Sequence, residues 1–297
     1  MSCFNSPSKR AGLALCLLVC LTYLSGCATS MTSMTDARAY DVGEVQAVVA
    51  YQASVHGNIV GGLTNAATSA EEEFNRDSDE PISEESFRNW LDTAIIFALF
   101  RPGTGPELMI RTGVTDDVLE GIDVGFKTDL NILKFDGKLQ FWQSEDEAHA
   151  ASVSLGYAHH LNVGNKILSY LTLTDFSRSD LDLKMMYGFR LSEFVKVNVA
   201  PHLIISRIKP ESKIPDWLLE RLPDEVKQLD PGQFFETEWM QYYGANFNIM
   251  LGYKYAFVAL DAGMFYLNFN PTVVNEERNY GGGALSIAAG ISGHYKF

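Results

Sequence analysis

The chain has 297 residues, a formal net charge of −14 at neutral pH, 46% hydrophobic residues and 20% charged residues. This acidic excess argues against a nucleic-acid partner and against a polybasic lipid-binding surface. After residue 26, no apolar stretch reaches the roughly 20 residues that a membrane-spanning helix needs.

The first 26 residues have the three parts of a secretory signal peptide. Lys9 and Arg10 form its basic start, an apolar run follows, and small residues come before Cys27. Residues 24–27 read Leu-Ser-Gly-Cys, which resembles the lipobox of bacterial lipoproteins. The resemblance implies cleavage between Gly26 and Cys27 and acylation of the Cys27 thiol. An ordinary signal peptide with a chance cysteine is the alternative.

The other three cysteines lie at positions 3, 16 and 20, so the mature chain keeps one thiol. A lone free cysteine in the cell envelope would be exposed to oxidation, whereas acylation uses the thiol up. Residue 28 is Ala rather than Asp, and the resemblance to lipoproteins then implies passage through the lipoprotein export machinery to the outer membrane. The acyl chains would serve delivery or assembly, or would hold residues 27–42 as a spacer against the inner leaflet.

From residue 43 onward, apolar residues recur with a period of two, which is typical of β-strands. In the last stretch, one face carries Leu285, Ile287, Ala289, Ile291, Tyr295 and Phe297. The opposite face is small or polar, and residues 180–191 repeat the pattern. In a soluble sandwich such an apolar face packs on a second sheet, whereas in a membrane barrel it faces lipid.

Aromatic residues favour the barrel, because they recur near the ends of the expected strands, as at Trp142, Trp239 and Tyr253. Such girdles are typical of the two membrane interfaces. The closing residues Tyr295 and Phe297 resemble the C-terminal signal of outer-membrane barrel proteins. That resemblance implies recognition by the barrel assembly machinery.

We therefore predict an all-β fold, an antiparallel up-and-down transmembrane barrel over residues 43–297. The expected strands are residues 44–56, 92–101, 106–114, 118–128, 131–142, 148–160, 166–175, 180–191, 194–207, 236–253, 255–269 and 281–297. These make about twelve, with ten or fourteen as the neighbouring even counts. With both termini in the periplasm, residues 57–91, 209–235 and 271–280 lie outside the cell as long loops.

Two of these external loops have distinctive compositions. The first carries Glu71, Glu72, Glu73, Asp77, Asp79, Glu80, Glu84 and Glu85. This cluster is either a cation site or a solvated loop, and it lacks EF-hand spacing. In the other loop, residues 215–229 predict two short helical turns around Trp217 that either cover the barrel mouth or bind a partner.

By parity, the inward face of the strands carries charges of both signs. The candidate lumen-facing residues are Glu107, Arg111, Asp123, Lys127, Lys134, Lys138, Asp182, Lys184, Arg190, Lys196, His202, Asp261 and His294. Such residues either pair and fill a narrow lumen or line an open pore, and the sequence leaves both open. No metal site or cofactor motif is present in the sequence.

The leading hypothesis is a non-enzymatic, porin-like channel in the outer membrane of a Gram-negative cell, for small solutes or hydrophobic compounds of unknown identity. A lipid-modifying hydrolase or acyltransferase is the first alternative. Its candidate pairs are Ser152 or Ser154 with His159 or His160, and Ser206 with His202. Spacing does not assemble nucleophile, base and orienting group, which weighs against catalysis. A surface binding or adhesion protein is the second alternative.

Overall fold

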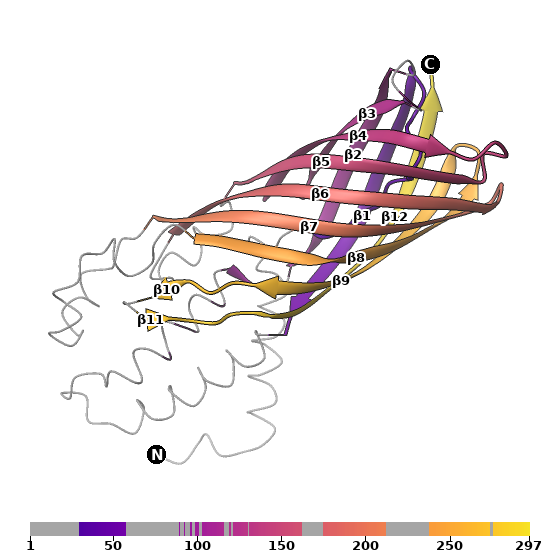
Figure 1. Ribbon diagram of the computed structural model, residues 1–297. Helices are drawn as coiled ribbons and strands as arrows, with labels where there is room; N and C mark the ends of the chain where they lie inside the picture. Colours follow the sequence, from indigo (N-terminus) through magenta and orange to yellow (C-terminus); the bar gives the residue numbers. More distant parts are fainter. Residues whose placement is uncertain are drawn as a thin grey trace, which may run out of the picture.

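The structure is a computed structural model in which residues 30–57, 89, 92, 96, 99–100, 103–115, 119, 121–129, 131–161, 175–211, 238–273 and 276–297 are described. Within these ranges, ten strands close into an antiparallel barrel (Figure 1). The barrel strands are β1 (Glu44–His56), β2 (Gly103–Thr115), β3 (Ile122–Thr128), β4 (Ile132–Gln143), β5 (His149–His160), β6 (Asp175–Ser192), β7 (Val195–Glu211), β8 (Glu238–Tyr253), β9 (Ala256–Asn268) and β12 (Gly282–Lys296).

Each barrel strand pairs with its neighbour in the chain, and β1 pairs with β12 to close the barrel. The short strands β10 (Thr272–Val273) and β11 (Glu276–Glu277) form a separate hairpin between β9 and β12. The prediction of an all-β, antiparallel, closed barrel is confirmed. Among the described residues, no helix is long and apolar enough to cross a membrane.

The expected count of about twelve strands was too high by two. The described residues of the expected strand 92–101 are not in a strand: Asp92, Ile96 and Leu99 are helical, and the Phe100 N–H donates to the Ile96 carbonyl at 2.8 Å. Its buried apolar residues follow a helical spacing rather than an alternation. The expected strand 166–175 lies almost wholly outside the described residues, and β5 pairs directly with β6, which leaves no barrel position between them. The acidic cluster and the helical turns at 215–229 also lie outside.

Alternation explains why these residues form the barrel wall. In β9, Val258, Leu260 and Met264 point outward, and the odd-numbered residues that alternate with them are buried. The outer face is apolar in the other strands as well, for example at Val49, Ile110, Leu155, Leu183, Leu251, Ile287 and Ile291. Polar groups lie on the inner face. The polarity of the wall is therefore the reverse of that in a soluble protein, with apolar side chains outside and polar side chains inside.

The two ends of the barrel differ. At one, called here the short-turn end, tight turns join β4 to β5, β6 to β7 and β8 to β9, and the C-terminus lies with them (Figure 1). Glu147 and Lys254 adopt left-handed backbone angles in two of these turns. The opposite, long-loop end carries the connections from β1 to β2, β5 to β6, β7 to β8 and β9 to β12.

Residues 30–40, called here the N-terminal segment, lie inside the barrel. Met31 and Ala37 have no exposed surface, and Met34 is 1% exposed. The chain reverses after this segment, where the Glu44 N–H donates to the Asp41 carbonyl at 2.9 Å and Gly43 has a φ of 83°. Residues 27–42 were expected to form a spacer at the inner leaflet. Of these, residues 30–40 instead lie in the lumen.

Candidate functional site

The barrel interior is the candidate functional site, and it holds most of the charged residues that parity assigned to it. Buried or half-buried inside are Glu107, Arg111, Asp123, Lys127, Lys134, Lys138, Asp182, Lys184, Lys196, His202, Asp261 and His294. Arg190 is exposed near the short-turn end. Cys27 and Gly26 lie outside the described residues, whereas Tyr295 and Phe297 are exposed at the short-turn end.

These interior side chains bind the backbone of the N-terminal segment. Its amides are the donors in four hydrogen bonds: Ser33 to Asp261 (3.2 Å), Ala37 to Asn198 (3.0 Å), Ala39 to Gln140 (2.6 Å) and Tyr40 to Asp123 (3.3 Å). The four acceptors come from β9, β7, β4 and β3. The segment is therefore held by several sides of the wall at once.

Interior donors bind the carbonyl groups of the same segment. The Lys138 ammonium donates to the carbonyls of Asp36, at 2.8 Å, and of Arg38. Further along, Lys127 donates to the Thr32 carbonyl at 3.1 Å, and the Asn246 amide to the Met31 carbonyl at 2.7 Å. Buried peptide groups without water need such partners, so the polar lumen satisfies an extended chain along its length.

Side-chain pairs add to these contacts. The Asp36 carboxylate lies 2.9 Å from the Lys196 ammonium, and the Thr32 hydroxyl donates to Glu107 at 2.7 Å. Lys127 in turn lies 2.9 Å from Glu107. The segment thus contributes one of the charges that balance the basic residues of the lumen.

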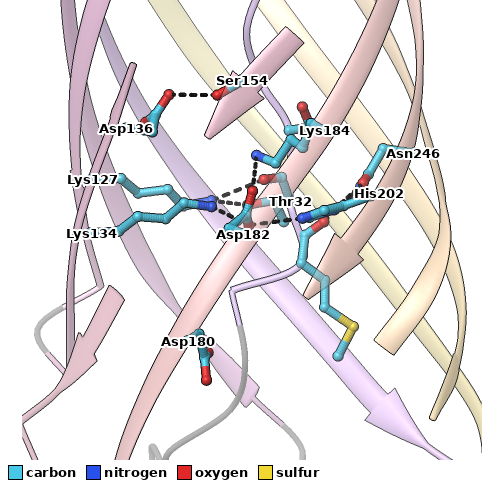
Figure 2. Close-up of polar contacts among 12 residues, drawn as sticks. Thr32, Lys127, Lys134, Asp136, Ser154, Asp180, Asp182, Lys184, His202 and Asn246 are labelled. Atoms are coloured by element: carbon cyan, nitrogen blue, oxygen red, sulfur yellow. Dashed lines mark hydrogen bonds and ion pairs between the residues drawn. The ribbon is translucent and has the colours of Figure 1, made fainter. Parts of the chain in front are cut away.

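Asp182 is the centre of a network beside the segment (Figure 2). Its carboxylate accepts from Lys134 and lies 2.8 Å from Nε2 of His202, while Lys184 approaches to 3.8 Å. Nδ1 of His202 lies 3.0 Å from the Asn246 side-chain oxygen. Figure 2 shows Thr32 among these residues, so the network and the segment share one interior.

The structure does not bring together the serine and histidine pairs weighed for catalysis. His160 lies 2.9 Å from Asp180, and His202 is occupied by Asp182 and Asn246. The Ser154 hydroxyl donates to Asp136, the Ser206 hydroxyl accepts from Arg178, and Ser152 is fully buried. His159 points to the outer face. In the part of the chain that the structure describes, these residues form a structural polar network.

Sequence reasoning missed one serine and histidine pair. The Ser292 hydroxyl lies 3.1 Å from Nε2 of His294, whose Nδ1 lies 3.7 Å from Glu44. The order matches nucleophile, base and orienting group. Ser292, however, has no exposed surface, and the Tyr40 ring lies 5.6 Å from the His294 ring. Residues at positions i and i+2 of a strand share a face, so the alternation in the sequence could have indicated this pair.

The long-loop half of the lumen is filled differently. His56 and Phe100 have ring centroids 5.5 Å apart, and Phe100 also contacts Phe269 at 6.0 Å and Tyr280 at 6.4 Å. The Tyr280 hydroxyl donates to Asp92 at 2.8 Å. Burial and the nearby Asp92 carboxylate raise the pKa of Tyr280 above its usual range, so its hydroxyl keeps its proton. Further buried apolar residues in this part of the barrel include Ile204, Ile208, Met240 and Leu267.

Two glycines leave room for the segment. A Cβ at Gly113 would lie 2.2 Å from the carbonyl oxygens of Tyr40 and Asp41. A Cβ at Gly188 would lie 2.8 Å from that of Ala37. The wall and the segment are therefore fitted to each other at these places.

No cluster of metal-ligating side chains occurs among the residues that the structure describes. The acidic residues between positions 71 and 85 lie outside the described ranges. The carboxylates of the described lumen are instead within reach of lysine and arginine, as Asp123 is of Arg111 and Lys138.

No protein-family model and no curated protein matches the chain. Among solved structures, it is similar to Neisserial surface protein A, with 11% identity, a TM-score of 0.28, and 86% of this chain and 96% of that chain covered. The attachment invasion locus protein Ail of Yersinia pestis has 10% identity and a TM-score of 0.25, over 86% and 99% of the two chains. The outer membrane protease OmpT of Escherichia coli has 9% identity and a TM-score of 0.34, over 90% and 99%. The likeness concerns the outer-membrane β-barrel fold, and scores this low carry no argument about function.

Proposed function

We propose that the protein is a bacterial outer-membrane barrel with its short-turn end in the periplasm. The apolar outer face supports this, since exposed leucine, isoleucine and valine side chains need a lipid solvent. Exposed aromatics lie toward both ends, with Trp142, Tyr253 and Tyr295 at the short-turn end and Trp239 and Tyr266 toward the long-loop end. Lipoprotein export and the barrel assembly machinery are the partners that this route needs.

Within that membrane, we propose that the folded protein is a closed, non-conducting envelope component whose role lies in what it presents outside the cell. The observation that carries this proposal is the filled lumen. The N-terminal segment is buried along its length, and its peptide groups are bound by interior side chains from several strands. Solute passage would require this segment to leave.

Conductance of the purified, folded protein in planar bilayers tests the proposal. We expect no channel steps, because the segment and the ion pairs around it occupy the lumen. Heat-modifiable migration of the same sample on a denaturing gel verifies that the barrel is folded. Regular unitary steps in that sample would overturn the proposal.

A channel gated by the segment is the second candidate, because the contacts that hold it are polar. Lys127, Lys138 and Lys196 would be hydrated in an emptied lumen. Release of the segment would therefore leave no charged group buried without a partner. Replacing residues 31–40 by a Gly-Ser stretch of equal length separates the two candidates. The gated channel predicts conductance steps in that variant and none in the natural chain. A silent variant that is correctly folded would eliminate it.

The lipid-modifying alternative depends on Ser292 and His294. Both lie beneath the N-terminal segment and face the lumen, where a phospholipid in the outer membrane has no access. A serine-reactive fluorophosphonate should therefore leave the folded natural chain unlabelled. Labelling that disappears in a Ser292→Ala variant would restore the enzyme hypothesis.

A further inference from the structure

The direction in which the N-terminal segment runs through the lumen bears on where Cys27 leaves the barrel. We infer that the barrel carries its own N-terminus through the lumen, so that Cys27 emerges at the long-loop end and its acyl chains enter the outer leaflet. This inference rests on the membrane orientation proposed above and on acylation of Cys27. It reverses the expected periplasmic location of the N-terminus.

The direction of the segment follows from the turn that ends it. The chain reverses between Asp41 and Glu44, beside the C-terminus, where the Phe297 N–H donates to the Gly43 carbonyl at 2.9 Å. From there β1 runs from the short-turn end to the long-loop end. Because the reversal precedes β1, the residues before it approach the turn from the long-loop side.

The contacts along β3 agree with this direction. Tyr40 donates its N–H to Asp123, the second residue of β3 at the short-turn end. Thr32 binds Lys127, the penultimate residue of the same strand at the long-loop end. Between these two contacts, the segment therefore runs the length of β3.

The barrel wall is low beside Lys127, the residue that binds Thr32. β3 ends at Thr128 and β4 begins at Ile132, so this rim lies directly beyond Lys127. Four residues lie between Cys27 and Thr32, so the two are five residue steps apart, and an extended chain of five steps spans at most about 18 Å. Cys27 can therefore reach the rim between β3 and β4 and the lipid outside it.

The inner leaflet is not accessible to the same cysteine. To reach it, the chain before residue 30 would have to return through a lumen that its own continuation already fills. Nor can the acyl chains remain inside, because the groups beside Thr32 are the Glu107–Lys127 pair and the Asp182 network, and the apolar part of the lumen is occupied by the rings packed around Phe100. Apolar chains gain their stability from lipid, and the outer leaflet is the only one within reach.

An epitope inserted between residues 29 and 30 tests the inference in intact cells. We expect antibody to bind without permeabilisation of the outer membrane. The same epitope inserted between Glu145 and Asp146, in the turn from β4 to β5, is the matched control and should be detected only after permeabilisation. The reverse pattern, with the N-terminal epitope hidden in intact cells, would overturn the inference.

These outcomes are separable from those that test the closed barrel. A protein can be silent in planar bilayers and still expose its N-terminal epitope to the periplasm, which contradicts this inference alone. Conductance steps in a protein whose epitope is on the cell surface would contradict the closed barrel alone.

Discussion

The lumen near the short-turn end and the lumen near the long-loop end differ in what fills them. Near the short-turn end, charged and amide side chains bind the backbone of residues 36–40. Near the long-loop end, on the side of β1, β8 and β9, aromatic rings pack around Phe100. One half is closed by polar contacts that water can replace, and the other by apolar packing that water cannot replace.

Because different contacts fill the two halves of the lumen, the halves should respond to different substitutions. A substitution in the aromatic half should lower the stability of the barrel and leave the N-terminal segment bound. A substitution in the polar half should release the segment and leave most of the barrel stability in place.

Phe100→Ala should have the largest effect. Phe100 has no exposed surface, and removing a buried phenylalanine costs about 3–5 kcal/mol. Urea unfolding in phospholipid vesicles measures the loss. Phe141→Ala, at a partly exposed position on the outer face, is the control and should cost less. If Phe100→Ala also speeds hydrogen exchange of residues 31–40, the two halves are coupled and the comparison fails.

Asp36→Ala should release the N-terminal segment. The substitution leaves Lys196 without its carboxylate partner, and Lys196 is partly exposed, which reduces the cost to about 2 kcal/mol. That free energy corresponds to a roughly thirtyfold faster amide exchange at Ala37 and Ala39. Asp36→Asn keeps the shape and should fall between. Unchanged exchange in both variants would show that the backbone contacts alone hold the segment.

Gly113→Ala should weaken the same segment through shape instead of charge. The added methyl group would meet the Tyr40 and Asp41 carbonyl oxygens, and forced overpacking costs about 1–3 kcal/mol. Gly105→Ala is on the same strand, where a Cβ meets nothing within 4 Å. Hydrogen exchange at Tyr40 should rise in the first variant alone. Equal behaviour of both alanine variants would contradict the close fit at Gly113.

Lys296→Ala should have the smallest effect. Lys296 pairs with Asp41 at the entry of the segment, and both side chains are largely exposed to solvent. Exposed ion pairs contribute at most about 1 kcal/mol, so urea unfolding and exchange at Tyr40 should hardly change. A loss as large as that of Asp36→Ala would place the control of the segment at the mouth of the barrel and not in its interior.

The wall of the barrel could be predicted from the sequence because lipid and lumen impose opposite polarities on alternate residues. The first strand was expected at 44–56 and lies at Glu44–His56. The expected strand at 92–101 was wrong, because its apolar residues follow a helical spacing and make no alternating pattern. Parity also indicated an inward direction for Asp123 and Lys138, but a period of two does not say what an inward side chain binds.

The N-terminal segment could not be predicted for a physical reason. Thr32, Ser33 and Ala37 are small residues with no alternation, and the lumen binds them mainly through peptide groups that every residue has. Backbone recognition leaves little trace in side-chain patterns. The clearer signal was in the wall, where glycines at 113 and 188 remove the side chains that would clash.

The N-terminal segment and β1 are joined through the turn at Gly43, and this bears on the order in which the barrel is built. β1 and β12 pair in register from Glu44 opposite Lys296 to His56 opposite Ala284, and this seam joins the first strand to the last. While the seam is open, the segment can be laid sideways against the growing sheet. The acyl chains inferred above for Cys27 would then stay in the bilayer throughout. Closure of the seam would complete the folding pathway, and no acyl chain would have to pass through a finished pore.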